Sequence, residues 1–175
     1  MKIVIIEPLG ITPEKLAEAT AAVKARGHEI VAYDTKEEDQ DKLAERGKDA
    51  DIIIIANQPF RKNVIEKCKN LKLLSVAFTG VDHIDVDFCK EKGICVCNAA
   101  GYSTNAVAQH TFALILEHYS KVREYAKFVA DGQWKRSKTF SPFVYPLNEL
   151  AGKTIGIVGF GSIGSAVAKI AQAFE

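Results

Sequence analysis

Three glycines late in the sequence most constrain what this chain can fold into. Gly159, Gly161 and Gly164 have the spacing G-x-G-x-x-G, after the apolar run Thr154–Val158 and before a segment, Ser165–Phe174, predicted as a helix. The first glycine permits a tight turn, the second lets the backbone approach a pyrophosphate, and the third lets helix and strand pack closely. The helix N-terminus then offers N–H groups to phosphates. The pattern predicts a dinucleotide-binding unit; the alternative is a glycine-rich turn without a ligand.

The first hundred residues alternate between apolar runs and amphipathic or charged segments. This order predicts a parallel α/β sheet with helices on both faces. The first run ends in Glu7-Pro8-Leu9-Gly10 without a glycine triplet, so this domain is not expected to be the dinucleotide domain. The predicted strands are Lys2–Glu7, His28–Tyr33, Asp51–Ala56, Leu71–Phe78 and Ile94–Val96, and the predicted helices are Pro13–Arg26 (capped by Thr12), Lys36–Lys48, Arg61–Asn70 and Val86–Lys92.

A long amphipathic segment connects the two regions. One apolar stripe predicts a single helix over Asn105–Ala130, long enough to meet another subunit or to bridge domains. The sequence predicts a loop over Asp131–Glu149 and a sixth strand over Lys153–Val158. We therefore expect an α/β domain over residues 1–100, then a linker helix and the first βα unit of a Rossmann domain over residues 101–175.

Charge and cysteine content narrow the function classes. The formal net charge of +1, from 23 basic and 22 acidic residues, gives no electrostatic case for nucleic acid or for an anionic membrane. No apolar run is long enough for a membrane span, and the first residues are predicted as a strand and not as a signal peptide. Free cysteines are typical of a reducing compartment, so a cytoplasmic protein is expected. The four cysteines are expected to be buried free thiols, with no metal site, although Cys95 and Cys97 form a C-x-C on one predicted strand.

Three segments carry a family resemblance, and with their spacing they extend over the whole sequence. They are Thr79–Asp85 (TGVDHID), Asn98–Thr111 (NAAGYSTNAVAQHT) and Leu150–Gly164 (LAGKTIGIVGFGSIG). Together they resemble the D-isomer-specific 2-hydroxyacid dehydrogenases. The resemblance implies a flavodoxin-like substrate domain, an NAD-binding Rossmann domain, and hydride transfer between a nicotinamide and a small 2-hydroxy or 2-keto acid. NADP is the alternative cofactor.

The resemblance also assigns roles to residues. Backbone N–H groups at Thr79 and Gly80 would bind the substrate carboxylate, and Thr79 would also lie beside the nicotinamide. Ser162 and Ile163 would present backbone donors to the pyrophosphate, together with the three glycines of the motif. Tyr102 matches a position that faces the substrate in the lactate-like branch; a half-buried aromatic residue at a domain hinge is the equal alternative. A homodimer through the long helix 105–130 is the expected assembly.

The proton-transfer groups are not expected among these residues. In the family a histidine, a glutamate and an arginine act together, and the resemblance places them beyond Glu175. His83 is the histidine nearest the cleft but is not expected to carry a proton, and Asp82 and Asp85 are expected to cap its turn. Gln109 departs from the usual Glu there without removing a catalytic group.

Two readings of the function follow. The chain is either a truncated dehydrogenase that is inactive in isolation or a non-catalytic dimerisation or ligand-binding module. A second chain that supplies the missing half is a third possibility. In each case one βα unit cannot bury its own apolar surface, so its tail is expected to be poorly ordered, to dock on a neighbouring chain or to promote association.

Overall fold

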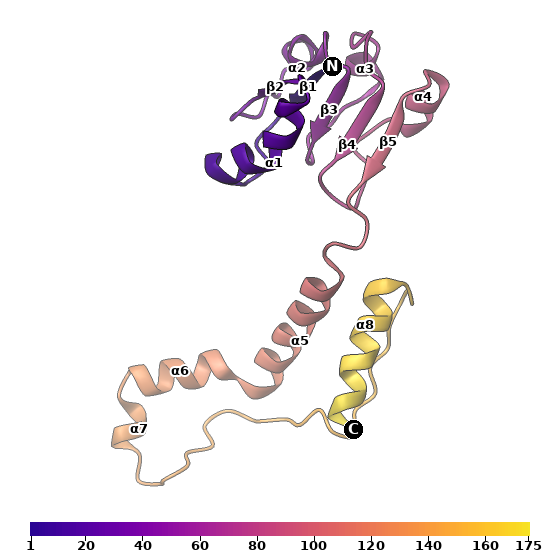
Figure 1. The fold of residues 1–175 in the computed structure, drawn as a ribbon. Coiled ribbons are helices and arrows are strands. Elements are labelled where there is room, and N and C mark those ends of the chain that lie inside the picture. The colour runs from indigo at the N-terminus through magenta and orange to yellow at the C-terminus, as the bar shows by residue number, and fades with distance from the viewer. The chain divides into compact units, whose positions relative to one another are not determined.

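The computed structural model describes residues 1–175, which form two compact units, Met1–Ala100 and Gly101–Glu175 (Figure 1). The first unit holds one five-stranded parallel sheet in the order β2-β1-β3-β4-β5. This is the flavodoxin-like order. The strands are β1 (Lys2–Ile5), β2 (Glu29–Ala32), β3 (Ile52–Ile55), β4 (Leu73–Val76) and β5 (Cys95–Asn98).

Four helices accompany this sheet: α1 (Pro13–Ala25), α2 (Gln40–Gly47), α3 (Lys62–Ile65) and α4 (Val86–Glu91). Thr12 caps α1 as expected, since its Oγ1 accepts from the Lys15 N–H at 3.4 Å. The core lies between the sheet and the helices, with Ile53 on central β3 and Leu43 on α2 fully buried. The predicted parallel α/β architecture is confirmed for this unit.

Two predicted helices in this unit are too long. The predicted Lys36–Lys48 helix begins only at Gln40, because the Asp39 carboxylate accepts from the N–H groups of Asp41 and Lys42 at 2.8 and 3.2 Å and caps the helix there. The predicted Arg61–Asn70 helix is reduced to the four residues of α3.

The cysteine expectation is half wrong. Cys68 and Cys89 are buried in the core, but Cys95 and Cys97 are exposed. Both exposed thiols lie on β5, which is an edge strand of the sheet. An edge strand has a neighbouring strand on one side only. The side chains of Cys95 and Cys97 are therefore less covered than the burial expected for them.

The second unit is helical, and the single long helix predicted over Asn105–Ala130 is wrong. It divides into α5 (Thr104–Ser120) and α6 (Val122–Ala130) at Lys121, whose backbone is left-handed (φ 53°, ψ 38°). Ala108 and Phe112 are buried on α5 and Phe128 is buried on α6, whereas Val129 is exposed. No helix in either unit is long and apolar enough to cross a membrane.

The predicted strand over Lys153–Val158 does not form. A β-strand needs a hydrogen-bonded neighbour, and this segment pairs with none. The helix after it is α8 (Ser162–Ala171), followed by the 3-10 turn η1 (Gln172–Phe174). It starts at Ser162 instead of Ser165.

Helix α8 packs beside α5 (Figure 1). The rings of Phe112 and Phe174 are stacked, with their centroids 5.4 Å apart, and Val167 is buried in the same cluster. One face of α8 is therefore packed, whereas Val158 before it is fully exposed. The loop predicted over Asp131–Glu149 is irregular except for a short helix, α7 (Gln133–Arg136).

Candidate functional site

The Thr79–Gly80 turn lies at the carboxyl edge of the sheet, shortly after β4. Its two residues are exposed. The Asn98 side-chain amide donates to the Thr79 carbonyl at 2.6 Å, and the Thr79 hydroxyl donates to the Ala99 carbonyl at 3.4 Å. These bonds hold the turn against the end of β5. Gly80 has no side chain, so its exposed backbone is not covered by one. Such an arrangement suits the approach of a small anion to backbone N–H groups.

The acidic residues after this turn do not cap it as expected. Asp85 instead caps α3: its carboxylate accepts from the Lys62 N–H at 2.7 Å and pairs with the Arg61 guanidinium at 3.1 Å. The Lys62 hydrogen bond is the main reason that the pKa of Asp85 lies below its usual value. Asp82 is exposed, and a side chain at Gly80 would bring a Cβ within 3.6 Å of the Asp82 carboxylate.

His83 is half-buried at the end of the turn. Its Nε2 atom is buried and has no hydrogen-bond partner. Burial lowers the pKa of His83, and the charge of Glu7 acts in the opposite direction. A histidine of this kind favours its neutral form at neutral pH, which does not fit a protonated general acid.

Sequence reasoning missed Glu7, which was read only as the end of the first strand. Its side chain is fully buried, and its Oε1 accepts the backbone N–H groups of Ala56, Asn57 and Gln58 at 2.9, 2.9 and 2.8 Å. Lys36 Nζ lies 3.8 Å from the other carboxylate oxygen. The signal in the sequence was a charged residue that continues an apolar strand directly before Pro8.

The glycine motif has the local geometry that its spacing predicts. Gly159 has φ +91°, a conformation that favours glycine. A Cβ at Gly164 would collide with the carbonyl oxygen of Gly159 and come within 3.2 Å of the Ile157 side chain, whereas a Cβ at Gly161 would meet nothing. Helix α8 starts without a side-chain cap, so its first N–H groups are open to an anion. The turn fits the pyrophosphate of a dinucleotide.

The remaining predicted site residue, Tyr102, lies before α5 in the second unit and is 61% exposed. Thr79 and Gly80 belong to the first unit, and Tyr102 belongs to the second together with Gly159, Gly161, Ser162, Ile163 and Gly164. No group of three or more histidine, cysteine or acidic side chains in the chain is arranged to hold a metal ion.

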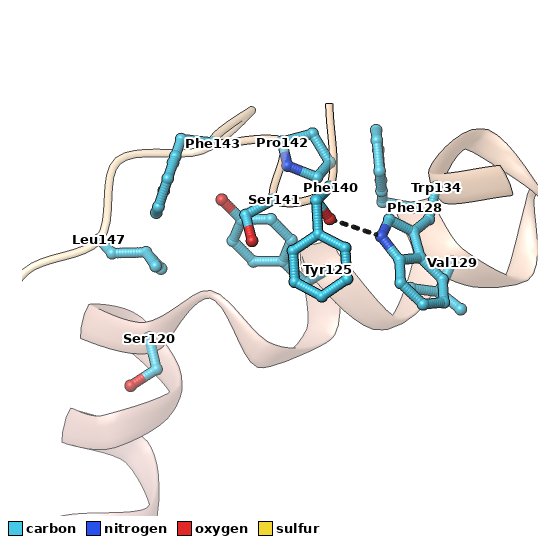
Figure 2. A pocket seen from close by; sticks show the side chains of 10 residues that line it. All are labelled: Ser120, Tyr125, Phe128, Val129, Trp134, Phe140, Ser141, Pro142, Phe143 and Leu147. Atoms are coloured by element: carbon cyan, nitrogen blue, oxygen red, sulfur yellow. Dashed lines mark hydrogen bonds between the residues drawn. The ribbon is translucent and has the colours of Figure 1, made fainter. Parts of the chain in front are cut away.

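An aromatic pocket of about 500 Å³ lies in the second unit (Figure 2). Tyr125 and Phe128 of α6 form one wall, and Trp134 donates from its indole N–H to the Phe140 carbonyl at 3.1 Å. The Tyr125 hydroxyl donates to the Tyr145 carbonyl at 3.0 Å and so holds the loop over the pocket. The remaining lining residues are Ser120, Val129, Ser141, Pro142, Phe143 and Leu147.

Comparison with known proteins gives a consistent result. The family model of the D-isomer specific 2-hydroxyacid dehydrogenase catalytic domain matches residues 3–173. A hydroxypyruvate reductase of Blautia hydrogenotrophica is 38% identical over 173 residues, which cover 99% of this chain and 53% of that protein.

Solved structures give the same picture. An acyclic imino acid reductase in complex with NADPH and D-Arg matches with a TM-score of 0.82 at 33% identity, over 99% of this chain and 53% of that one. A D-lactate dehydrogenase from Aquifex aeolicus, complexed with NAD and lactic acid, matches with a TM-score of 0.77 at 27% identity, over 99% and 49%. This chain thus spans about half the length of the relatives that it matches.

Proposed function

Because the chain belongs to the D-isomer specific 2-hydroxyacid dehydrogenase family, we propose that it forms the acid-binding domain and the first part of the cofactor-binding domain of an NAD-dependent dehydrogenase of small 2-hydroxy acids. The observation that carries this proposal is the exposed turn at Thr79 and Gly80. It lies at the carboxyl edge of a parallel sheet, where ligands of such sheets bind.

In this proposal Thr79 and Gly80 hold the carboxylate of a 2-hydroxy or 2-keto acid with their backbone N–H groups. Asn98 supports that role, since its hydrogen bond to the Thr79 carbonyl fixes the peptide plane between the two residues. Tyr102 is proposed as a further side chain toward the acid, because its place directly after Gly101 matches the family position that faces the substrate in the lactate-like branch.

In this proposal the turn from Gly159 to Gly164 binds the cofactor. Ser162 and Ile163 would donate backbone N–H groups to the pyrophosphate at the uncapped start of α8. When bound, the nicotinamide supplies or accepts the hydride exchanged with C2 of the acid. Relatives of this family bind NAD or NADPH, and we propose NAD here, with NADP as the alternative.

We also propose that these 175 residues by themselves do not turn over substrate. In the family a histidine carries the proton and an acidic residue raises its pKa. His83, the histidine beside the turn, has no hydrogen-bonded carboxylate, and its burial lowers its pKa. It therefore lacks the partner that proton transfer at neutral pH requires.

Titration of the labelled chain with glyoxylate, followed by NMR, tests the acid site. We expect the Thr79 and Gly80 amide resonances to shift, and Gly80→Ala to weaken the shift, because its Cβ adds a methyl group beside the two N–H groups, 3.6 Å from the Asp82 carboxylate. Gly156→Ala is the matched control, since a Cβ there meets nothing. Amide shifts confined to other parts of the chain would refute the assignment. NADH consumption with pyruvate, hydroxypyruvate and glyoxylate is expected to stay at the blank rate.

A non-catalytic dimerisation module is the second candidate, and the apolar surface of the second unit favours it. Phe140 and Phe143 line the aromatic pocket (Figure 2). They are 90% and 80% exposed. Leu114 and Val122 on α5 and α6 are also exposed. Exposed apolar surface of this extent is typical of association sites, and we propose a second copy of the chain as its partner. Sedimentation equilibrium should find a dimer that Phe140→Ser together with Phe143→Ser converts to a monomer.

The compartment is proposed from the cysteines. All four are free thiols, including the exposed Cys95 and Cys97. Free exposed thiols are typical of a reducing environment, so we propose a cytoplasmic location.

A further inference from the structure

The order of the strands marks one position on the sheet as special. After β1 the chain adds β2 on one side and then crosses to add β3 on the other. Ligands of open α/β sheets bind beyond the carboxyl ends of the strands at such a switch point. In this chain the switch point lies between the ends of β1 and β3, and Glu7 and the loop Ala56–Phe60 meet there.

The protein's own carboxylate fills that position. Three consecutive backbone N–H groups of the loop converge on Oε1 of Glu7, in the manner by which a backbone cradle holds an anionic ligand. Glu7 is fully buried, so the cradle is occupied from inside the molecule. A substrate anion must therefore bind elsewhere on the same edge, and the neighbouring turn is the one at Thr79 and Gly80.

We propose that Glu7 is a positioning residue: its carboxylate fixes the loop Ala56–Phe60, and this loop in turn orients the Thr79–Gly80 turn that receives the substrate carboxylate. This inference rests on the acid-binding function proposed above. Glu7 touches no substrate in this arrangement and acts only through the backbone that it holds.

The connection between the two loops is a backbone one. The Phe60 N–H donates to the His83 carbonyl at 2.9 Å, and Phe60 pairs with Ile84 as an isolated parallel bridge. The Ile84 N–H donates to the Val81 carbonyl at 2.9 Å, which closes the turn directly after Gly80. Phe60 is fully buried, so this attachment is anchored in the core.

The turn is thus held from two sides. Asn98 of β5 fixes Thr79 on one side, and the loop held by Glu7 fixes His83 on the other. Lys36 adds a second tie to the loop, because its Nζ donates to the Asn57 side-chain oxygen at 2.9 Å while it lies 3.8 Å from Glu7 Oε2. That oxygen has no hydrogen bond of its own.

The substitution Glu7→Gln tests the two contacts that Glu7 makes with the loop, the hydrogen bonds to its Oε1 and the ion pair of its Oε2 with Lys36. A glutamine side chain fills the same volume and keeps one oxygen for the cradle, but its other end is an amide NH₂ that faces Lys36 without a negative charge. We expect the amide either to keep the cradle with the ion pair lost or to turn and leave the cradle without an acceptor. In both cases the loop loses a contact that fixes it, either the ion pair with Lys36 or the acceptor of its three N–H groups, and we expect it to shift. Glu18→Gln on α1, an exposed carboxylate, is the matched control.

The experiment is NMR on the 175-residue chain with three readouts. In Glu7→Gln, and not in Glu18→Gln, we expect the Gly80 and Val81 amide resonances to move. The Kd for glyoxylate should rise roughly threefold to tenfold, the effect of weakening one hydrogen-bonded contact. The pKa of His83 should fall, because Glu7 and Asp82 raise it while burial and Arg61 lower it. If Glu7→Gln does not fold, Glu7→Asp, which keeps the charge and withdraws the carboxylate, is expected to give the same amide and Kd changes.

The outcomes are separable. Unchanged Gly80 and Val81 amides with an unchanged Kd would overturn the proposal, even if the pKa of His83 falls, because charge alone would then couple the two groups. If the wild-type chain does not bind glyoxylate, the acid-binding function fails. In that case the Gly80 and Val81 amides still decide the role of Glu7: movement supports positioning, and no movement refutes it.

Discussion

The Glu117 carboxylate accepts a hydrogen bond of 3.0 Å from the backbone N–H of Arg123, across the break between α5 and α6. Lys121 lies between them in a left-handed conformation, and its own N–H donates to the Glu117 carbonyl at 2.9 Å. Glu117 therefore ends α5 with its main chain and caps α6 with its side chain. This arrangement satisfies backbone groups that a break would otherwise leave without partners.

Glycine at this break is expected to stabilise the chain. A left-handed backbone costs a residue with a Cβ about 1 kcal/mol, so Lys121→Gly should raise the free energy of unfolding by ~0.5–1 kcal/mol. Ala126→Gly, within α6, should lower it by a similar ~0.5–1 kcal/mol. Urea denaturation followed by circular dichroism measures both. A loss of stability in Lys121→Gly would show that the break is not held as described.

Alanine at Gly164 is expected to disrupt the glycine turn. Its Cβ would collide with the Gly159 carbonyl oxygen, so we expect a loss of ~1–3 kcal/mol in stability, as for other overpacked sites, together with loss of NADH binding. Gly156→Ala should change neither, because the space around it is open. Thermal melts and NADH fluorescence titrations give the two readouts. Equal effects of the two substitutions would contradict the close approach at Gly164.

Two of the four thiols are expected to react in the folded chain. Burial raises the pKa of Cys68 to about 12 and also raises the pKa of Cys89, so neither forms a thiolate readily at neutral pH. Cys95 and Cys97 are exposed on the edge strand β5. Titration with Ellman's reagent should find two fast thiols before denaturation and four after it. The double variant Cys95→Ser and Cys97→Ser should have no fast thiol; a remaining one would mean that the core opens.

Acid is expected to destabilise the first unit through His83. Burial holds its pKa in the folded chain below the usual 6.5, so the unfolded chain takes up the proton at higher pH. The contribution of neutral His83 to stability is therefore complete above 6.5 and is lost as the pH falls through the lower folded value.

His83→Gln tests this dependence. Between about pH 7.5 and pH 5 its free energy of unfolding should decline less than that of the wild type. His118→Gln, an exposed residue on α5, should decline as the wild type does. Parallel slopes for wild type and His83→Gln would show that His83 is not buried in solution.

The first unit was largely predictable from the sequence because its signals are local and agree with one another. Apolar runs such as Ile52–Ile55 recur between capped amphipathic segments, and this alternation has few solutions other than a parallel sheet. The local geometry at Gly159 and Gly164 was predictable for a similar reason, since the spacing of glycines specifies backbone conformations directly.

The errors have a different origin: each depended on a particular contact that the apolar pattern does not encode. No glycine or proline in the sequence marks the break at Lys121, and the side chain of Glu117, four residues earlier, stabilises it. The strand predicted over Lys153–Val158 requires a neighbouring strand, which an apolar pattern alone does not guarantee. Glu7 was missed because its partners, the amides of residues 56–58, lie far along the sequence.

That separation has a consequence for how the chain folds. The three hydrogen bonds of Glu7 join residues 49, 50 and 51 positions apart, so they form only after the chain has passed through β2 and α2 and β3 has aligned with β1. Contacts of such sequence separation form slowly, because a large loop must close first. During synthesis, a nascent chain that has paired only β1 with β2 exposes an unpaired glutamate at the end of an apolar strand. We therefore expect the carboxyl edge of this sheet to form late in folding.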